Sequence, residues 1–248
     1  MKKRMKTLII IPSRLSASRL PGKPLLKING LSIISHVFNK AMETNIGDVY
    51  VATEDQEIVD DVHLNGGKAI LTQNKHKTGT DRIYEALKKI GKSNVELIMN
   101  LQGDEPLINI EDIKSLHHQM KKTNTELGTL AAKIKDKDIF DKQNIVKVVT
   151  GESLDNSQFP EATNFYRHLN NFTENTYHHL GIYCYRLETL EKFISLEQSQ
   201  NEIKNNLEQL RALDNNIKIN VALAKTPSIG VDTKEDFVAI KKIMEYKT

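Results

Sequence analysis

Three cationic side chains follow the first apolar run of the sequence. Residues 8–11 read Leu-Ile-Ile-Ile, Pro12 ends the run, and the segment that follows carries Arg14, Arg19 and Lys23. Arginine can form paired hydrogen bonds with phosphate oxygens and lysine supplies a point charge, so this segment suits a polyphosphate. It contains neither the G-x-x-x-x-G-K-[ST] nor the G-x-G-x-x-G phosphate motif. A solvated loop without a ligand is the alternative.

A second candidate for anion binding is the stretch Thr-Gly-Thr-Asp-Arg at residues 78–82. Its small residues, Gly79 among them, let backbone N–H groups approach a ligand where a helix is expected to begin near Asp81. Helix N-termini favour anions, and Arg82 adds a cation. Thr80 or Asp81 acting only as a helix cap is the alternative.

Carboxylates follow the apolar run at residues 95–101, in the sequence Asn-Leu-Gln-Gly-Asp-Glu-Pro. Asp104 and Glu105 stand on this loop, and a carboxylate beside a phosphate site is what Mg²⁺ usually needs. Gln102 on the same loop could contact a polar substrate. A turn residue or a cap for the next helix is the alternative for the two acids.

The last motif is Gly-Val-Asp-Thr-Lys-Glu-Asp-Phe at residues 230–237. Thr233 and Asp236 have the spacing of a capping box that opens a helix. That role leaves Asp232 unexplained, so it is a candidate for a second metal ligand or for a turn.

The predicted elements must bring these motifs together. Apolar runs predict four strands, and helical periodicity predicts helices between them, at residues 7–11, 32–44, 48–53, 58–62, 68–72, 83–90 and 95–101. This alternation indicates an α/β fold with a parallel sheet and helices on both faces. Ligands of such sheets bind beyond the carboxyl ends of the strands, where these motifs are expected.

The later part of the chain changes character. Strands without regular helices between them are expected at residues 127–134, 144–149, 179–186 and 217–224. A mixed sheet follows, in a single domain over residues 1–248. The polar, Asn-rich segment at about residues 150–176 is the candidate for a flexible arm.

Composition sets broad limits. Hydrophobic residues make up 39% and charged residues 27%, and the net charge is +3 from 35 basic and 32 acidic residues. This balance argues against a nucleic-acid coat. Cys184 is the only cysteine, which excludes an intrachain disulfide and favours a small buried residue. With no apolar run long enough for a signal or a membrane span, we expect a soluble, cytoplasmic protein.

Taken together, the motifs resemble the 3-deoxy-manno-octulosonate (Kdo) cytidylyltransferases, also called CMP-Kdo synthetases. The opening IPSRLSASRLPGKPL is similar to the family's nucleotide loop, and GTDR, NLQGDEP, HLGIYCYR, LEQLRAL and GVDTKEDF follow in the family's order. Other sugar-activating nucleotidyltransferases share the first loop and QGDEP more loosely. HLGIY followed by LEQLR is the more specific pair.

The resemblance implies a Rossmann-like nucleotide-diphospho-sugar transferase fold with a dimerisation arm, usually as a homodimer. It implies that CTP and Kdo react to CMP-Kdo and pyrophosphate, with Mg²⁺, in cytoplasmic lipopolysaccharide biosynthesis, without nucleic-acid or membrane partners. The sugar's anomeric hydroxyl would attack the α-phosphate in line. CMP activation of another sugar acid, 8-amino-Kdo or a sialic acid, and a non-catalytic nucleotide-binding module are the alternatives.

The resemblance also implies roles for residues at matching positions. Arg14, Arg19 and Lys23 would bind the triphosphate, and Asp104 and Asp232 would hold magnesium; Arg14, Lys23, Asp104 and Asp232 are the catalytic candidates. The nucleotide pocket would include Thr78, Gly79, Thr80 and Arg82, and the sugar site Gln102, His179, Glu208 and Gln209. For Glu208 and Gln209 a solvated helix face is the alternative. His178 and His179 would point to opposite faces of a strand, and the resemblance selects His179.

One segment departs from the family pattern. Pro160 and Glu161 stand where the family has Ser and Arg, and His178 stands where it often has Arg. Arg167 could substitute for the missing cation. Either the segment has drifted at a dimer contact, which we favour, or the protein takes a modified sugar such as 8-amino-Kdo.

Overall fold

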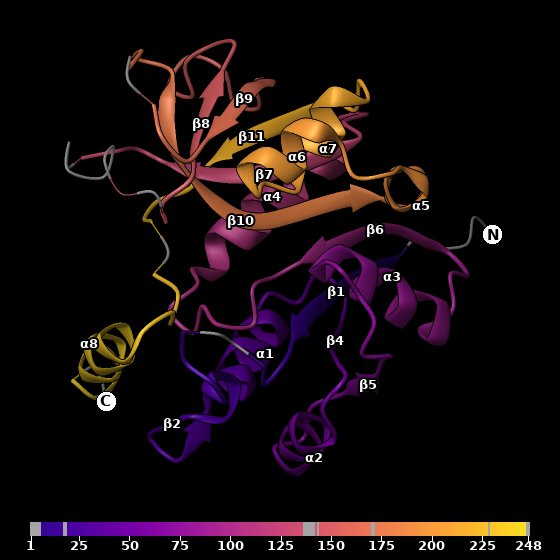
Figure 1. The fold of residues 1–248 in the computed structure, drawn as a ribbon, viewed down its shortest axis with the longest axis vertical. Helices are drawn as coiled ribbons and strands as arrows, with labels where there is room; N and C mark the ends of the chain where they lie inside the picture. Colours follow the sequence, from indigo (N-terminus) through magenta and orange to yellow (C-terminus); the bar gives the residue numbers. More distant parts are fainter. Residues whose placement is uncertain are drawn as a thin grey trace. The chain divides into compact units, whose positions relative to one another are not determined.

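The computed structural model describes residues 6–16, 19–135, 142, 144–169, 172–227 and 229–246. The chain divides into two compact units (Figure 1): Met1–Ile110 together with Ser228–Thr248, and Glu111–Pro227. Each unit is described by itself. The single domain over residues 1–248 stays a prediction.

The first unit is built on four parallel strands. They lie in the order β6 (Val95–Asn100), β1 (Lys6–Ser13), β4 (Asp48–Thr53) and β5 (Ala69–Leu71). Ile9, Ile10 and Ile11 of β1 are fully buried. A strand covered on both faces reads as a continuous apolar run, which is why the sequence pattern predicts these strands correctly.

Three helices connect these strands: α1 (Ile33–Glu43), α2 (Gln56–Leu64) and α3 (Gly79–Ile90). The chain runs from β1 to β4 to β5 and then returns to the other side of β1 to form β6. Because crossovers between parallel strands are right-handed, this reversal puts α3 on the face opposite to α1 and α2. The predicted helices on both faces are confirmed.

The loop after β1 contains short elements that were not predicted. A 3₁₀-helix, η1 (Lys23–Leu25), follows Gly22, whose φ of 72° suits glycine. A small hairpin of β2 (Lys27–Ile28) and β3 (Leu31–Ser32) comes next. These elements carry the chain from the three cations to α1.

Helix α8 (Lys234–Glu245) completes the first unit. It begins with the predicted capping box, in which the Thr233 hydroxyl accepts from the Asp236 amide and the Asp236 carboxylate accepts from the Thr233 amide. Ile240 of α8 packs with the fully buried Ile28 and Val231. This packing fixes the segment that carries Asp232.

The second unit holds a mixed sheet. Strand β7 (Leu127–Ala132) pairs parallel with β11 (Ile219–Leu223) and antiparallel with β10 (Thr176–Arg186). Strand β10 also pairs antiparallel with β8 (Lys147–Thr150). Cys184 on β10 is buried as a free thiol, as expected.

Helices of the second unit are α4 (Ile110–Lys122), α5 (Leu187–Ser195), α6 (Gln200–Asn205) and α7 (Gln209–Asp214). Three of them lie between β10 and β11, so the expectation of strands without helices between them is wrong there. The last two are only one to two turns long, and such helices leave little periodicity in a sequence.

The polar segment at about residues 150–176 contains strand β9 (Ala162–Tyr166), which pairs antiparallel with β8. Ala162 and Phe165 are buried, whereas Thr163 is exposed. This burial does not alternate strictly, so the pattern gives no strand signal. Residues 170 and 171 of the predicted arm lie outside the described residues.

None of the helices in the described part of the chain is long and apolar enough to cross a membrane.

Candidate functional site

A cavity of about 330 Å³ opens in the first unit. It is lined by segments that follow β1, β5 and β6, together with the start of α3 and the segment before α8. The lining residues that the sequence analysis selected are Arg14, Arg19, Lys23, Thr78, Gly79, Arg82, Gln102, Asp104 and Asp232. The carboxyl ends of parallel strands are where open α/β sheets bind ligands.

Thr80 is the one nucleotide-pocket candidate that does not line this cavity. It lies in α3 and is buried. The helix begins at Gly79, earlier than expected, and its N-cap is Thr78. The Thr78 hydroxyl accepts from the Asp81 amide at 3.2 Å, and the Asp81 carboxylate accepts from the Thr78 amide at 3.1 Å. Asp81 thus takes part in capping α3, but the N-cap is Thr78 and not Thr80, and Thr78 and Gly79 also line the cavity.

Lys23 lies between the two candidate metal carboxylates. Its Nζ donates to Asp104 Oδ2 at 2.5 Å and to Asp232 Oδ1 at 3.3 Å. Arg19 adds an ion pair with the other oxygen of Asp232, at 2.9 Å. Both carboxylates thus share Lys23, and two acidic oxygens lie around one positive charge.

The backbone explains why these two carboxylates meet. The Val231 amide donates to the Asp104 carbonyl oxygen at 2.9 Å, which joins the segment before α8 to the loop after β6. Asp232 was predicted to lie directly after a strand. It does not, because the strand before it, β11, ends at Leu223. Its position depends on this long-range backbone contact.

Gly103 lets the loop after β6 pass close to the end of β1. A Cβ atom at this position would lie 2.9 Å from the Pro12 carbonyl oxygen and 3.1 Å from Ile34 Cδ1. Atoms this close must move apart, so a larger residue would displace the loop that carries Gln102 and Asp104.

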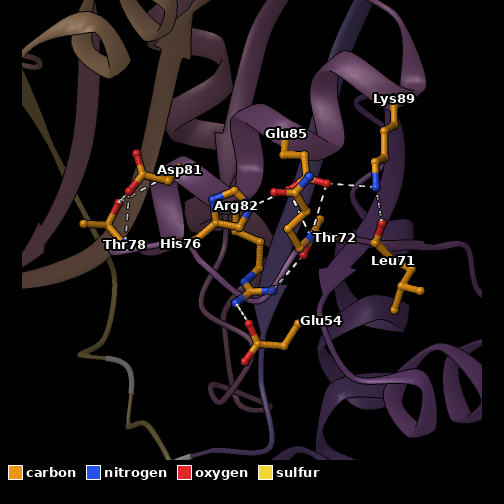
Figure 2. A network of polar contacts seen from close by, with 10 residues as sticks. Glu54, Leu71, Thr72, His76, Thr78, Asp81, Arg82, Glu85 and Lys89 are labelled. Carbon is orange, nitrogen blue, oxygen red and sulfur yellow. Dashed lines mark hydrogen bonds and ion pairs between the residues drawn. The ribbon is translucent and has the colours of Figure 1, made fainter.

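Arg82 is buried in the cavity wall rather than free to reach a ligand. Its guanidinium donates to Glu54 Oε2 at 2.5 Å and to Thr72 Oγ1 at 2.7 Å (Figure 2). These contacts tie α3 to the loops after β4 and β5. Arg82 therefore stabilises the wall of the cavity through these contacts.

Six lining residues were not among the predicted site residues, and two of these six have ionisable side chains. His76 and Lys77 contribute to the cavity from the loop between β5 and α3. The sequence Asn-Lys-His-Lys before the Thr-Gly-Thr-Asp-Arg motif is rich in basic groups. This local cluster of basic residues could have indicated that His76 and Lys77 bind an anion.

His179 lies in the second unit and is buried. Burial, with a smaller effect of His178, lowers the pKa of His179 to about 3, so its imidazole is neutral at neutral pH. The Thr129 hydroxyl has one proton, which it donates to the Ile182 carbonyl oxygen at 2.7 Å. Its oxygen must then accept from His179 Nε2 at 3.0 Å, which leaves Nδ1 as the proton acceptor of the ring.

Glu208 and Gln209 lie at the start of α7. Glu208 has a partly exposed side chain with Arg211 at 3.8 Å, and Gln209 is buried. The solvated-face alternative is therefore wrong for Gln209. Arg211 itself is held by two hydrogen bonds to the buried Glu202, at 2.6 and 2.8 Å. This ion pair supports the turn from which Glu208 projects.

The segment that departs from the family pattern also lies in the second unit. Glu161 Oε1 forms an exposed ion pair with Lys218 Nζ at 2.6 Å. Arg167 donates to the carbonyl oxygens of Asn205 and Asn206 at the end of α6, at 3.0 and 2.9 Å. Both groups therefore have partners within the second unit.

A cavity lined by cations and by two carboxylates that share a lysine, beyond the strand ends of an α/β sheet, is typical of a site that binds a nucleotide. Residues 8–219 match the cytidylyltransferase family. The 3-deoxy-manno-octulosonate cytidylyltransferase of Thermodesulfovibrio yellowstonii is 42% identical over 251 residues, which cover 97% of this chain and 98% of the relative. That of Afipia carboxidovorans is 41% identical over 240 residues, or 96% of each chain.

A solved structure of CMP:2-keto-3-deoxy-manno-octonic acid synthetase complexed with CTP is similar over nearly its whole length. Its TM-score is 0.88 at 34% sequence identity, and the match covers 98% of this chain and 100% of that one. The chain therefore belongs to the 3-deoxy-manno-octulosonate cytidylyltransferase family. The predicted fold is confirmed.

Proposed function

We propose that this protein transfers the cytidylyl group of CTP to Kdo and releases pyrophosphate. The observation that carries the proposal is Lys23 between Asp104 and Asp232 in the cavity, in a chain 42% identical to a cytidylyltransferase for this sugar. The arrangement supplies both the cations that a triphosphate needs and the carboxylates that a divalent cation needs.

The chemistry that we infer is an in-line displacement. The anomeric hydroxyl oxygen of the sugar forms a bond to the α-phosphorus of CTP and loses its proton, while the bond from the α-phosphorus to the bridging oxygen breaks. Pyrophosphate leaves with that oxygen. Arg14, Arg19 and Lys23 hold the triphosphate and neutralise the charge that develops on the leaving group.

Asp104 and Asp232 would hold Mg²⁺. Their oxygens already converge on one cation, which fits this role. Mg²⁺ usually takes one or two carboxylates and completes its shell with water and substrate phosphates. When bound, it polarises the phosphate and offsets negative charge. Lys23 is then free to turn from the carboxylates to the phosphates.

For the sugar we propose Gln102, His179, Glu208 and Gln209 as contacts, by resemblance to the family. Their chemistry is suitable, since a neutral imidazole, an amide and a carboxylate all form hydrogen bonds with hydroxyl groups. Homodimer formation and a cytoplasmic location are also proposals that rest on the family. Kdo is the proposed sugar because the relatives at 42% and 41% identity are cytidylyltransferases for it.

The test is pyrophosphate release from CTP and Mg²⁺ with Kdo, 8-amino-Kdo and a sialic acid in parallel. We expect turnover with Kdo at a kcat/KM well above those of the other two. A higher kcat/KM with 8-amino-Kdo or the sialic acid would show that Kdo is not the preferred substrate. CTP binding without turnover of any sugar acid would indicate a non-catalytic nucleotide-binding module.

A further inference from the structure

The loop between β5 and α3 is fastened to one stripe of α3. Arg82, Glu85 and Lys89 have the i, i+3, i+7 spacing that places side chains along one helix face, and all three bind the chain that enters this loop (Figure 2). Arg82 binds Thr72, and Lys89 donates to the Leu71 carbonyl oxygen at 2.7 Å. Glu85 lies between them.

Glu85 is the centre of this network. Its carboxylate accepts from the Gln73 amide at 3.0 and 3.2 Å and forms an ion pair with Lys89 at 2.8 Å. It also forms a very short contact with His76 Nε2. Burial alone would raise the pKa of Glu85, but hydrogen bonds from Lys89, the Gln73 amide and His76 outweigh it and lower the pKa to about 2. The group is therefore a carboxylate throughout the neutral range.

His76 connects this network to the nucleotide cavity. Its ring lies in the cavity wall next to Lys77 and is mostly buried, with 17% of its side chain exposed. A carboxylate can only accept, so Nε2 must carry the proton of the contact with Glu85. The ring can then offer only Nδ1 to a ligand as a hydrogen-bonding atom.

We propose that Glu85 is a positioning residue for the nucleotide, acting through His76. It sets the ring orientation of His76 and holds the loop, so that His76 and Lys77 face the nucleotide before it binds. A preformed contact spares the ordering cost that a mobile loop would add to binding. The inference rests on the proposed use of CTP. It places His76 and Lys77, which lie outside the predicted motifs, on the nucleotide side of the site.

A double-mutant cycle tests this role. CTP affinity is measured by calorimetry for the wild type, Glu85→Gln, His76→Gln and the double variant, and the KM values for CTP and Kdo are measured alongside. We expect Glu85→Gln to weaken CTP binding about tenfold in the wild type but less than about twofold in the His76→Gln background, because contacting residues couple. The KM for Kdo should stay within about twofold in every variant.

Glu43→Gln is the matched control, because Glu43 is an exposed glutamate on α1 with a 3.8 Å ion pair to Lys40. It should leave CTP affinity unchanged. Equal losses from Glu85→Gln in both backgrounds, or no loss at all, would overturn the proposal. If Glu85→Gln does not fold, His76→Gln alone decides, since unchanged CTP affinity in that variant also overturns it. Calorimetry needs no sugar turnover, so a wrong sugar assignment would remain distinguishable.

Discussion

The cavity of the first unit and the surroundings of His179 in the second unit hold their polar groups in opposite ways. In the first unit, Lys23 forms ion pairs with Asp104 and Asp232 beside the cavity. In the second, His179 is buried and neutral, bonded to a threonine hydroxyl. Opposed charges suit the triphosphate and metal ion that we propose for the first group, and neutral donors and acceptors suit the hydroxyl groups of the sugar that we propose for the second.

This difference predicts how substitutions in each region affect activity and stability. Charged groups at an open site are screened and can exchange partners when a ligand arrives. Buried groups have no water to replace a lost partner, so their removal costs stability as well as function. Variants of the charged groups that line the cavity should therefore lose activity while folded, and variants of buried polar groups should lose stability too.

The largest effect is expected from Asp104→Asn. The change removes a carboxylate that holds Lys23 and would hold Mg²⁺, so kcat should fall about a thousandfold, the order seen when a preorganised electrostatic group is lost. Pyrophosphate release measures it, and the melting temperature should stay close to that of the wild type.

Asp60→Asn is the control, because Asp60 is an exposed aspartate on α2 whose carboxylate accepts from the Gln56 side-chain amide at 2.7 Å. It should leave kcat unchanged. Full activity in Asp104→Asn would remove this residue from the metal site.

The next effect concerns stability in the second unit. Glu202→Gln leaves the buried Arg211 guanidinium with only the more distant Glu208 as an anionic partner, which should lower the free energy of unfolding by about 3 kcal/mol. Urea denaturation measures the change, and CTP affinity should persist wherever the variant is folded. Glu188→Gln, at an exposed position in the first turn of α5, serves as control. A loss no larger than that of the control would contradict the buried-pair account.

A third prediction uses pH. Unfolded histidine binds a proton below about pH 6.5, whereas folded His179, with its pKa lowered by burial to about 3, does not until far lower pH. The unfolded state therefore binds more protons in this window, and stability falls as pH decreases. His179 alone should cost about 2 kcal/mol between about pH 7 and about pH 5.

Urea denaturation of the wild type and His179→Gln at both pH values isolates this contribution. The variant should gain about 2 kcal/mol relative to the wild type on acidification. His168→Gln, at an exposed position, should follow the wild type at both values. An identical pH dependence in the wild type and His179→Gln would mean that His179 is not neutral and buried.

The smallest effect is expected from Glu161→Gln. Its partner Lys218 is exposed, and exposed ion pairs contribute little. The KM for Kdo should change less than about twofold, whereas Gln209→Leu, which removes a proposed sugar contact, should raise it clearly. A large change in Glu161→Gln would make this departure from the family pattern a specificity feature.

Much of the fold could be predicted from local sequence patterns. The runs that form β1, β4 and β6 are apolar because both sheet faces are covered, so their signal is strong. Strand β9 is different, since it pairs along one edge with β8 and keeps polar residues such as Thr163 and Asn164. Its pairing depends on a neighbour that the local pattern does not reveal.

The site could be predicted where it depends on strand ends. Arg14 and Asp104 each follow a strand of one parallel sheet, and topology then brings them to one edge. Asp232 and Arg82 depend on tertiary contacts instead, the first on the backbone bond between Val231 and Asp104 and the second on burial against Glu54. Sequence spacing carries no record of either contact.

The most direct test of the central claim is the identity of the products. ³¹P NMR of a reaction of the protein with CTP, Mg²⁺ and Kdo should show the triphosphate signals replaced by pyrophosphate and one phosphodiester in equal amounts, and Asp104→Asn should show neither. Unchanged CTP in the presence of the folded wild-type protein, Mg²⁺ and Kdo would contradict the assignment.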